Sequence, residues 1–134
     1  MIETIRLTNF KCFEKQTLKL GNITLLTGLN SSGKSTFIQS LLLLRQSHDQ
    51  GLLPNLGLAL NGDLVTIGTA QDALFEGAVE DQIGFKISWK DGKEAAWLFN
   101  YNRVADVLKL NSKPTYPKIY NTSLFNNSFR LFWV

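Results

Sequence analysis

A glycine-rich stretch followed by a lysine is the clearest chemical feature of the sequence. Gly28 and Gly33 bracket four residues, and Lys34 follows directly. At this spacing, consecutive backbone N–H groups can wrap around a phosphate, and the lysine ammonium can reach the β- and γ-phosphates. The glycines permit backbone angles and a close approach that a Cβ atom would block. The stretch therefore predicts a site for the phosphates of a nucleotide.

Two hydroxyl side chains extend this loop into the element that follows it. Ser35 can offer its hydroxyl to Mg²⁺. Thr36 has two interpretations that both stay open, a contact with the α-phosphate or a local backbone bond in the first helical turn. The predicted phosphate-site residues are Gly28, Asn30, Ser31, Ser32, Gly33, Lys34, Ser35 and Thr36, with Ser35 also as a metal ligand.

A strand and a helix must hold the loop in place. The apolar run Ile23–Leu26 predicts a buried strand before it, and Phe37–Leu42 begins a helix whose N-terminal dipole faces the anion. Gly51 and Pro54 mark where that helix stops. Because the helix is apolar on nearly every side, we expect it to lie between layers of the fold.

Two more strands, at about Ile2–Thr8 and Gln16–Leu20, come before the loop and are joined by a link over Asn9–Lys15. A phosphate loop that follows two strands is unusual for a small GTPase or kinase. After the helix, residues Gly51–Gly62 predict an ordered loop and Leu64–Ile67 a short strand.

A short capped helix and a hairpin complete the predicted elements. Thr69 is the expected N-cap of a helix over Thr69–Phe75, with Asp72 in a variant of the capping box. Asp91-Gly92 predicts a two-residue hairpin turn with Lys90 opposite Lys93. The predicted cross-strand pairs are Ile87 with Ala96, Phe85 with Leu98, and Lys86 with Trp97.

These elements predict an α+β fold, in which a phosphate-loop strand and helix carry two leading strands and an antiparallel insertion. The antiparallel, strand-rich part is expected over residues 78–134 of a single unit spanning 1–134. Within it, Val104–Leu110 predicts either a short helix or a strand, and Tyr116–Tyr120 another strand.

Composition sets mild limits on function. The chain has 134 residues and a net charge of +3, which is too small to indicate a nucleic-acid surface by itself. The lone Cys12 excludes an internal disulfide, and with only His48 beside it we expect no zinc cluster. His48 is expected to interact with the dipole at the end of the helix. No secretory signal or membrane-spanning run is expected, which favours the cytoplasm.

The loop and its flanks resemble a known group of proteins. The run Ile5–Phe13, a second strand, and the run Ile23–Thr36 are similar to the N-terminal half of ABC-type ATPases of the SMC, Rad50, RecF and OLD group. The continuation N-S-S-G-K-S-T-F-I-Q-S-L-L-L-L-R-Q resembles most a bacterial branch called AAA family ATPases. The resemblance is strong over residues 1–50 and weaker over Leu60–Phe75.

The resemblance implies ATP and Mg²⁺ as cofactors. It also implies that Lys11, Cys12 and Phe13 contact the nucleotide, against the alternative of a surface lysine and a core phenylalanine. A glutamine that senses Mg²⁺ is expected, with Gln71 and Gln82 competing for the role. By analogy, the partners are a second copy or a C-terminal lobe, with DNA or a nuclease in repair or phage defence.

The sequence also lacks motifs that are typical of this group. Phosphoryl transfer needs an acidic metal ligand and a residue that positions water. The apolar strand ending in Asp-Glu that supplies them, and the Ser-Gly-rich signature of the group, are both missing from this sequence. We therefore expect the N-terminal lobe of a longer ATPase, without catalytic residues of its own and inactive alone. A nucleotide-binding interaction module, or another P-loop kinase or GTPase, is the alternative.

Overall fold

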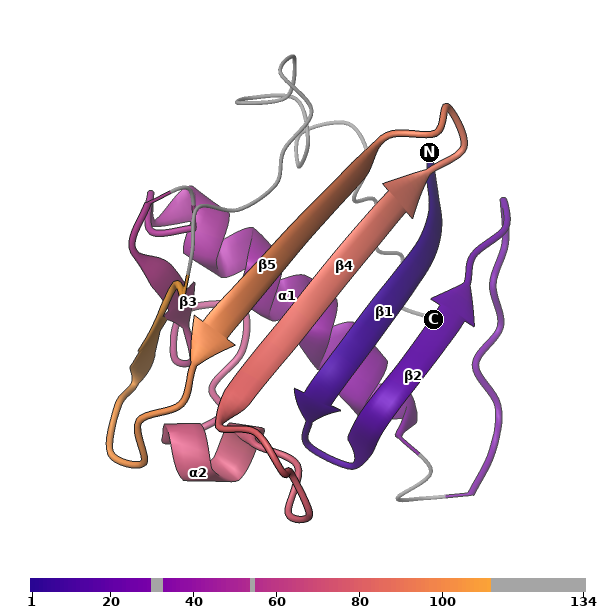
Figure 1. The fold of residues 1–134 in the computed structure, drawn as a ribbon. Helices are drawn as coiled ribbons and strands as arrows, with labels where there is room; N and C mark the ends of the chain where they lie inside the picture. The colour runs from indigo at the N-terminus through magenta and orange to yellow at the C-terminus, as the bar shows by residue number, and fades with distance from the viewer. Residues whose placement is uncertain (30–32, 54, 112–134) are drawn as a thin grey trace.

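The computed structural model describes residues 1–29, 33–53 and 55–111. Its centre is a four-stranded antiparallel sheet with the strand order β2-β1-β4-β5. Helix α1 lies across one face of this sheet, and the other face is turned toward the viewer in Figure 1. The strands are β1 (Ile2–Phe10), β2 (Phe13–Lys19), β4 (Gln82–Trp89) and β5 (Glu94–Asn100), and the helix is α1 (Lys34–Asp49). The predicted α+β class is confirmed.

The two faces of the sheet differ because side chains alternate along each strand. The face toward α1 is apolar and forms the core, with Leu7 and Ile87 both 0% exposed. Phe85 lies at its centre and makes edge-to-face contacts with Phe10 at 5.2 Å and Phe99 at 6.0 Å between ring centroids. Such aromatic pairs stabilise the core beyond the area they bury.

The hairpin between β4 and β5 forms, but its predicted register is wrong by one residue. The structure pairs Ile87 with Ala95, Phe85 with Trp97, and Lys86 with Ala96. The Trp89 N–H donates to the Lys93 carbonyl at 2.9 Å, so the turn spans Lys90 to Gly92. Gly92 adopts a φ of 84°, as expected for the last residue of a three-residue turn.

Burial explains why this register is preferred. A shift of one residue moves the whole of β5 to the other face. The observed register buries Trp97 and Phe99, whereas the predicted one would have buried Ala96 and Leu98. Since burying a large side chain contributes about 1.5–3 kcal/mol, the aromatic residues decide the pairing.

Two buried polar side chains attach α1 to a second, two-stranded sheet of β3 (Gly57–Ala59) and β6 (Val107–Lys109). The Gln46 side chain donates to the Ala59 carbonyl at 2.9 Å, and the Ala59 N–H donates to Ser47 Oγ at 2.8 Å. Gln46 also accepts from the Val65 N–H at 3.1 Å. Buried polar groups of this kind must be paired, so they fix the segment against the helix.

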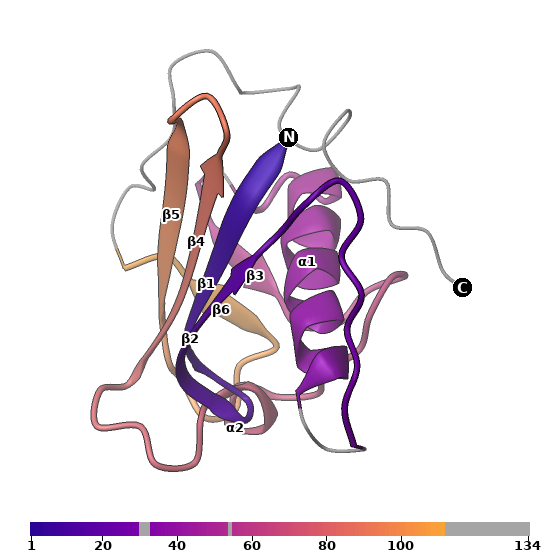
Figure 2. The same ribbon diagram turned by 90° about the vertical axis from the view of Figure 1, so that its right-hand side faces the viewer.

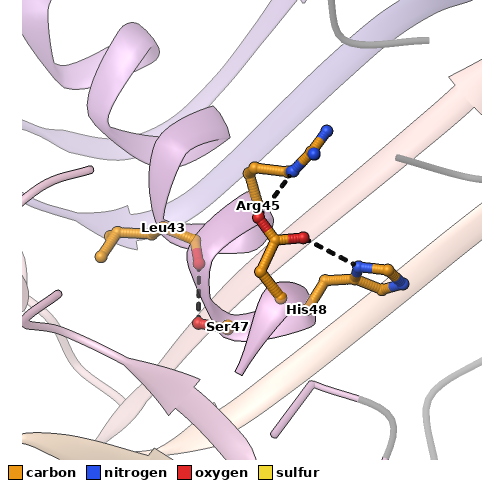
Figure 3. A network of polar contacts seen from close by, with 5 residues as sticks. Leu43, Arg45, Ser47 and His48 are labelled. Atoms are coloured by element: carbon orange, nitrogen blue, oxygen red, sulfur yellow. Dashed lines mark hydrogen bonds and ion pairs between the residues drawn. The ribbon is translucent and has the colours of Figure 1, made fainter. Parts of the chain in front are cut away.

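The end of α1 carries a small ionic cluster, drawn in Figure 3. Arg45 contacts Asp49 at 2.8 Å, and His48 Nδ1 lies 3.5 Å from the same carboxylate. Desolvation opposes ionisation of Asp49, but the hydrogen bonds from Arg45 and His48 outweigh it and lower the pKa of that carboxyl. His48 therefore lies in the last turn of α1, as predicted, and also contacts the Asp49 carboxylate.

Helix α2 (Ala70–Ala73) follows the predicted capping box. The Thr69 N–H donates to Asp72 Oδ2 at 2.8 Å, and both halves of the box are present. The hydrogen bonds from the Thr69 backbone and side chain lower the pKa of Asp72, and Lys11 adds a smaller electrostatic effect. The predicted short helix is confirmed over four residues.

Several smaller predictions need correction. The link after β1 is shorter than predicted, because only Lys11 and Cys12 separate the two leading strands. The predicted strand over Leu64–Ile67 contains only an isolated bridge between Asn61 and Thr66, and the predicted loop over Gly51–Gly62 contains β3. Of the two alternatives for Val104–Leu110, the strand is confirmed as β6. Tyr116–Tyr120 lies outside the described residues.

Candidate nucleotide site

The lysine of the phosphate loop folds back over the loop that precedes it. Lys34 is the first residue of α1, and its ammonium donates to the carbonyl oxygens of Gly28 and, at 3.2 Å, of Leu29. The charge therefore lies at the positive end of the helix dipole, where an anion is favoured. Asn30, Ser31 and Ser32 lie outside the described residues. Within the described part of the loop, the Lys34 ammonium thus lies at the start of α1.

Gly33 is required by packing as well as by backbone conformation. Its φ is 91°, and a Cβ built there would lie 2.3 Å from the Phe13 ring. Phe13 also packs against Phe37, with 5.2 Å between ring centroids. The aromatic ring at the start of β2 therefore lies against the loop and the first turn of α1. In this structure, the contacts of Phe13 are those of a packing residue.

The two hydroxyl residues of the loop have different surroundings. Ser35 is exposed at the first turn of α1, so its hydroxyl is open to solvent. Thr36 is 6% exposed and its Oγ1 lies 3.7 Å from the thiol of Cys12, which is itself exposed. The Ser35 hydroxyl is therefore accessible, whereas Thr36 contacts the turn between β1 and β2.

Lys11 connects three elements at the loop end of the molecule. Its backbone N–H donates to the Ala73 carbonyl at 2.7 Å, and its Nζ donates to Gln39 Oε1 at 3.0 Å. Its φ is 52°, an uncommon value for a residue with a side chain. Sequence reasoning did not single out Gln39. Only the fold could reveal this contact, because it depends on how the β1–β2 turn meets the helix.

The two glutamines proposed for metal sensing have different contacts. Gln71 is exposed on α2, and its side chain accepts from Arg103 Nε at 3.1 Å. Gln82 begins β4, where its carbonyl accepts from the Asn9 side chain at 3.1 Å. Helix α2 lies at the same end of the molecule as the start of α1 (Figure 2). No group of three or more metal-ligating side chains occurs among the described residues.

The strand predicted before the loop does not form. Residues 21–28 belong to no strand of the described structure, and Ile23 and Leu25 are 93% and 82% exposed. Leu29, next to the loop, is 85% exposed. The sequence has the apolar, β-branched composition of a buried strand, but the described residues provide no neighbouring strand to pair with it.

Comparison with known proteins identifies the family. Residues 1–129 match the AAA ATPase domain. The chain belongs to this family. Membership of an ATPase family supports ATP binding by this chain. No curated protein matches the chain.

Solved structures give a more distant likeness. One comes from work on the ATP-driven dimerization and DNA-stimulated activation of SMC ATPases. It matches with a TM-score of 0.42 and 19% identity, over 78% of this chain and 72% of that chain. No helix within the described ranges is long and apolar enough to cross a membrane.

Proposed function

We propose that this chain is the nucleotide-binding lobe of an ABC-type ATPase and that it binds ATP with Mg²⁺ through Gly28, Gly33, Lys34 and Ser35. The observation that carries the proposal is the Lys34 ammonium, which lies over the carbonyl groups of Gly28 and Leu29 at the start of α1. An anion at that point would gain the lysine charge and the helix dipole together.

The residues divide the work of binding. Backbone N–H groups of the loop hold the phosphates, and Lys34 neutralises the charge on the β- and γ-phosphates. Ser35, exposed one residue further on, supplies a hydroxyl to the metal ion. Lys11 and Phe13 hold the β1–β2 turn against this site, which supports a role for both beside the nucleotide.

We further propose that another part completes the ATPase, either a C-terminal lobe or a second copy. The exposed apolar residues Ile23 and Leu25 support this, because a strand of that composition is stable when neighbouring strands cover it. Gln71 and Gln82 remain alternatives for the residue that senses Mg²⁺. By analogy with the SMC, Rad50, RecF and OLD group, the assembled enzyme acts on DNA, in repair or phage defence in the cytoplasm.

Calorimetric titration with ATP and Mg²⁺ tests the binding step. We expect Lys34→Ala to weaken binding by about 2–4 kcal/mol, as for a desolvated charge pair that loses one partner. Lys109→Ala, which removes an exposed lysine from β6, is the matched control and should bind as the wild type does. Ser35→Ala should weaken binding only when Mg²⁺ is present. Equal affinity for the wild type and Lys34→Ala would refute the proposal.

A further inference from the structure

The face of the sheet that points away from α1 carries a concentration of positive charge. The register places three rows of side chains on this face, and no described helix covers it (Figure 1). Arg6, Lys15 and Lys19 are exposed there, and Lys86 lies beside Arg6. We name this surface the outer face, and its rows are Lys15-Thr8-Gly84-Leu98, Thr17-Arg6-Lys86-Ala96 and Lys19-Thr4-Ser88-Glu94.

The charge balance of the outer face is one-sided. Glu94 is the one carboxylate in its three rows, and it is paired with Lys86 at 2.8 Å. Arg6, Lys15 and Lys19 have no carboxylate among their cross-strand neighbours in the described sheet. The excess of positive charge on this one face equals the net charge of the entire chain, +3. Mild overall charge thus conceals a local basic surface.

We infer that the outer face binds the phosphate backbone of double-stranded nucleic acid without reading its sequence. Lysine, arginine and hydroxyl groups are the side chains that contact phosphate oxygens. Thr4, Thr8 and Thr17 line the same rows as the basic residues. Lys15 and Lys19 lie four residues apart on β2, about 13 Å at the usual rise of a strand. That spacing is close to the roughly 12 Å width of the major groove.

The apolar side chains argue against other partners. The aromatic residues Phe85, Trp97 and Phe99 are all buried on the opposite face. Single-stranded nucleic acid is held by stacking on aromatic rings, and protein interfaces depend on aromatic or arginine anchors in desolvated pockets. Ala96 and Leu98 are the apolar members of the outer rows, and both are half-buried. A charged and hydroxyl-rich surface fits a duplex backbone best.

This inference gives the DNA partner of the proposed function a binding surface, and to that extent rests on it. The test uses a labelled duplex of mixed sequence and the full chain without nucleotide, so that it is independent of ATP binding. Because Arg6, Lys15 and Lys19 face no carboxylate in the described sheet, the logarithm of the binding constant should fall with the logarithm of salt concentration with a slope of about −3. The triple variant Arg6→Gln, Lys15→Gln, Lys19→Gln should lose at least tenfold in affinity at low salt, and its slope should approach zero.

A matched triple variant distinguishes binding by the outer face from a general effect of net charge. Arg45→Gln, Arg103→Gln, Lys109→Gln removes the same charge from α1, the segment after β5, and β6. It should keep most of the binding and the slope. Glu94→Gln releases Lys86 from its ion pair and should tighten binding several-fold with a steeper slope, a gain that misfolding would not produce.

The outcomes that overturn the inference are distinct. Equal loss in the two triple variants would indicate only long-range attraction, and unchanged binding in the first would place the contact elsewhere. Tighter binding of a single strand or of polyglutamate than of the duplex would assign the face to another partner. If the duplex fails to bind while ATP still binds, the inference alone is wrong. If Lys34→Ala leaves ATP binding intact, the proposed function alone is wrong.

Discussion

The two sides of helix α1 have very different surroundings. On the sheet side, Phe85 is 2% exposed and contacts two other rings of the core. On the side of the phosphate loop, Ile23 and Leu25 are 93% and 82% exposed, although their composition is that of core residues. The same helix thus supports a finished core on one side and an uncovered apolar segment on the other.

This difference teaches which part of the site the described chain can build alone. The sheet side supplies the packing that holds the loop, through Phe13 against Gly33 and Lys11 against Gln39. In the segment before the loop, residues 21–29, only Leu26 packs against the core, and the other residues are exposed. In our proposal, the remaining lobe or a second copy covers this segment, and so couples assembly to the nucleotide.

The largest expected effect is a difference between the two sides of α1 in how much a substitution lowers the free energy of unfolding. Phe85→Ala removes a ring from the core and should lower the free energy of unfolding by about 3–5 kcal/mol. Leu25→Ala removes an exposed side chain and should change it by no more than about 0.5 kcal/mol. Chemical denaturation of both variants measures the contrast. A cost for Leu25→Ala as large as that for Phe85→Ala would mean that the loop side is already covered in solution.

Substitutions at two glycines test how the sheet side of α1 holds the loop. Gly33 and Gly51 both have positive φ, at 91° and 72°, but only Gly33 has the Phe13 ring where a Cβ would lie. Gly51→Ala should cost about 1–2 kcal/mol for its conformation alone. Gly33→Ala should cost about 1–3 kcal/mol more, from the collision, and should also weaken ATP binding.

A second substitution controls this comparison. Phe13→Ala removes the ring with which the new methyl group would collide. When it is combined with Gly33→Ala, the double variant should lose less stability than the sum of the two single losses. Combined with Gly51→Ala, the two losses should simply add. Denaturation of the single and double variants gives the coupling between Gly33 and Phe13 directly. Additive effects of Gly33→Ala and Phe13→Ala would show that the ring does not support the loop.

The smallest expected effect concerns α2. The pKa of Asp72 is lowered in the folded protein by its hydrogen bonds to Thr69, so its contribution is complete above the unfolded value of about 3.8. That contribution is lost as the pH falls through the lower, folded pKa. Asp72→Asn should therefore reduce stability at neutral pH and flatten its decline in acid. Thermal melts across the acid range measure both, and parallel curves for Asp72→Asn and the wild type would contradict the capping role.

Local patterns predicted the parts of this molecule that depend on local physics. The capping box at Thr69, the helix that starts at Lys34, and the two leading strands all follow from nearby residues. The general position of the β4–β5 hairpin follows from alternation and from Gly92. The loop spacing predicted Gly33 and Lys34 as site residues, and the structure places both at the start of α1.

Features that depend on distant partners could not be predicted in this way. The hairpin register is decided by burial of Trp97 against Phe85, which no turn rule contains. The Lys11–Gln39 contact joins a turn to a helix across 28 positions of the chain. The segment Ile23–Leu26 has strand composition but no strand geometry, because pairing requires neighbours that composition cannot supply.

The central claim is that this chain binds ATP but needs another part for turnover. Binding requires the loop, Lys34 and Ser35, whereas turnover also requires a metal-holding carboxylate and a residue that positions water. The most direct measurement is steady-state phosphate release by the purified 134-residue chain, compared with Lys34→Ala. The account predicts negligible release from both, and slow hydrolysis from a version extended beyond residue 134. A rate near or above about 1 per second that Lys34→Ala abolishes would contradict it.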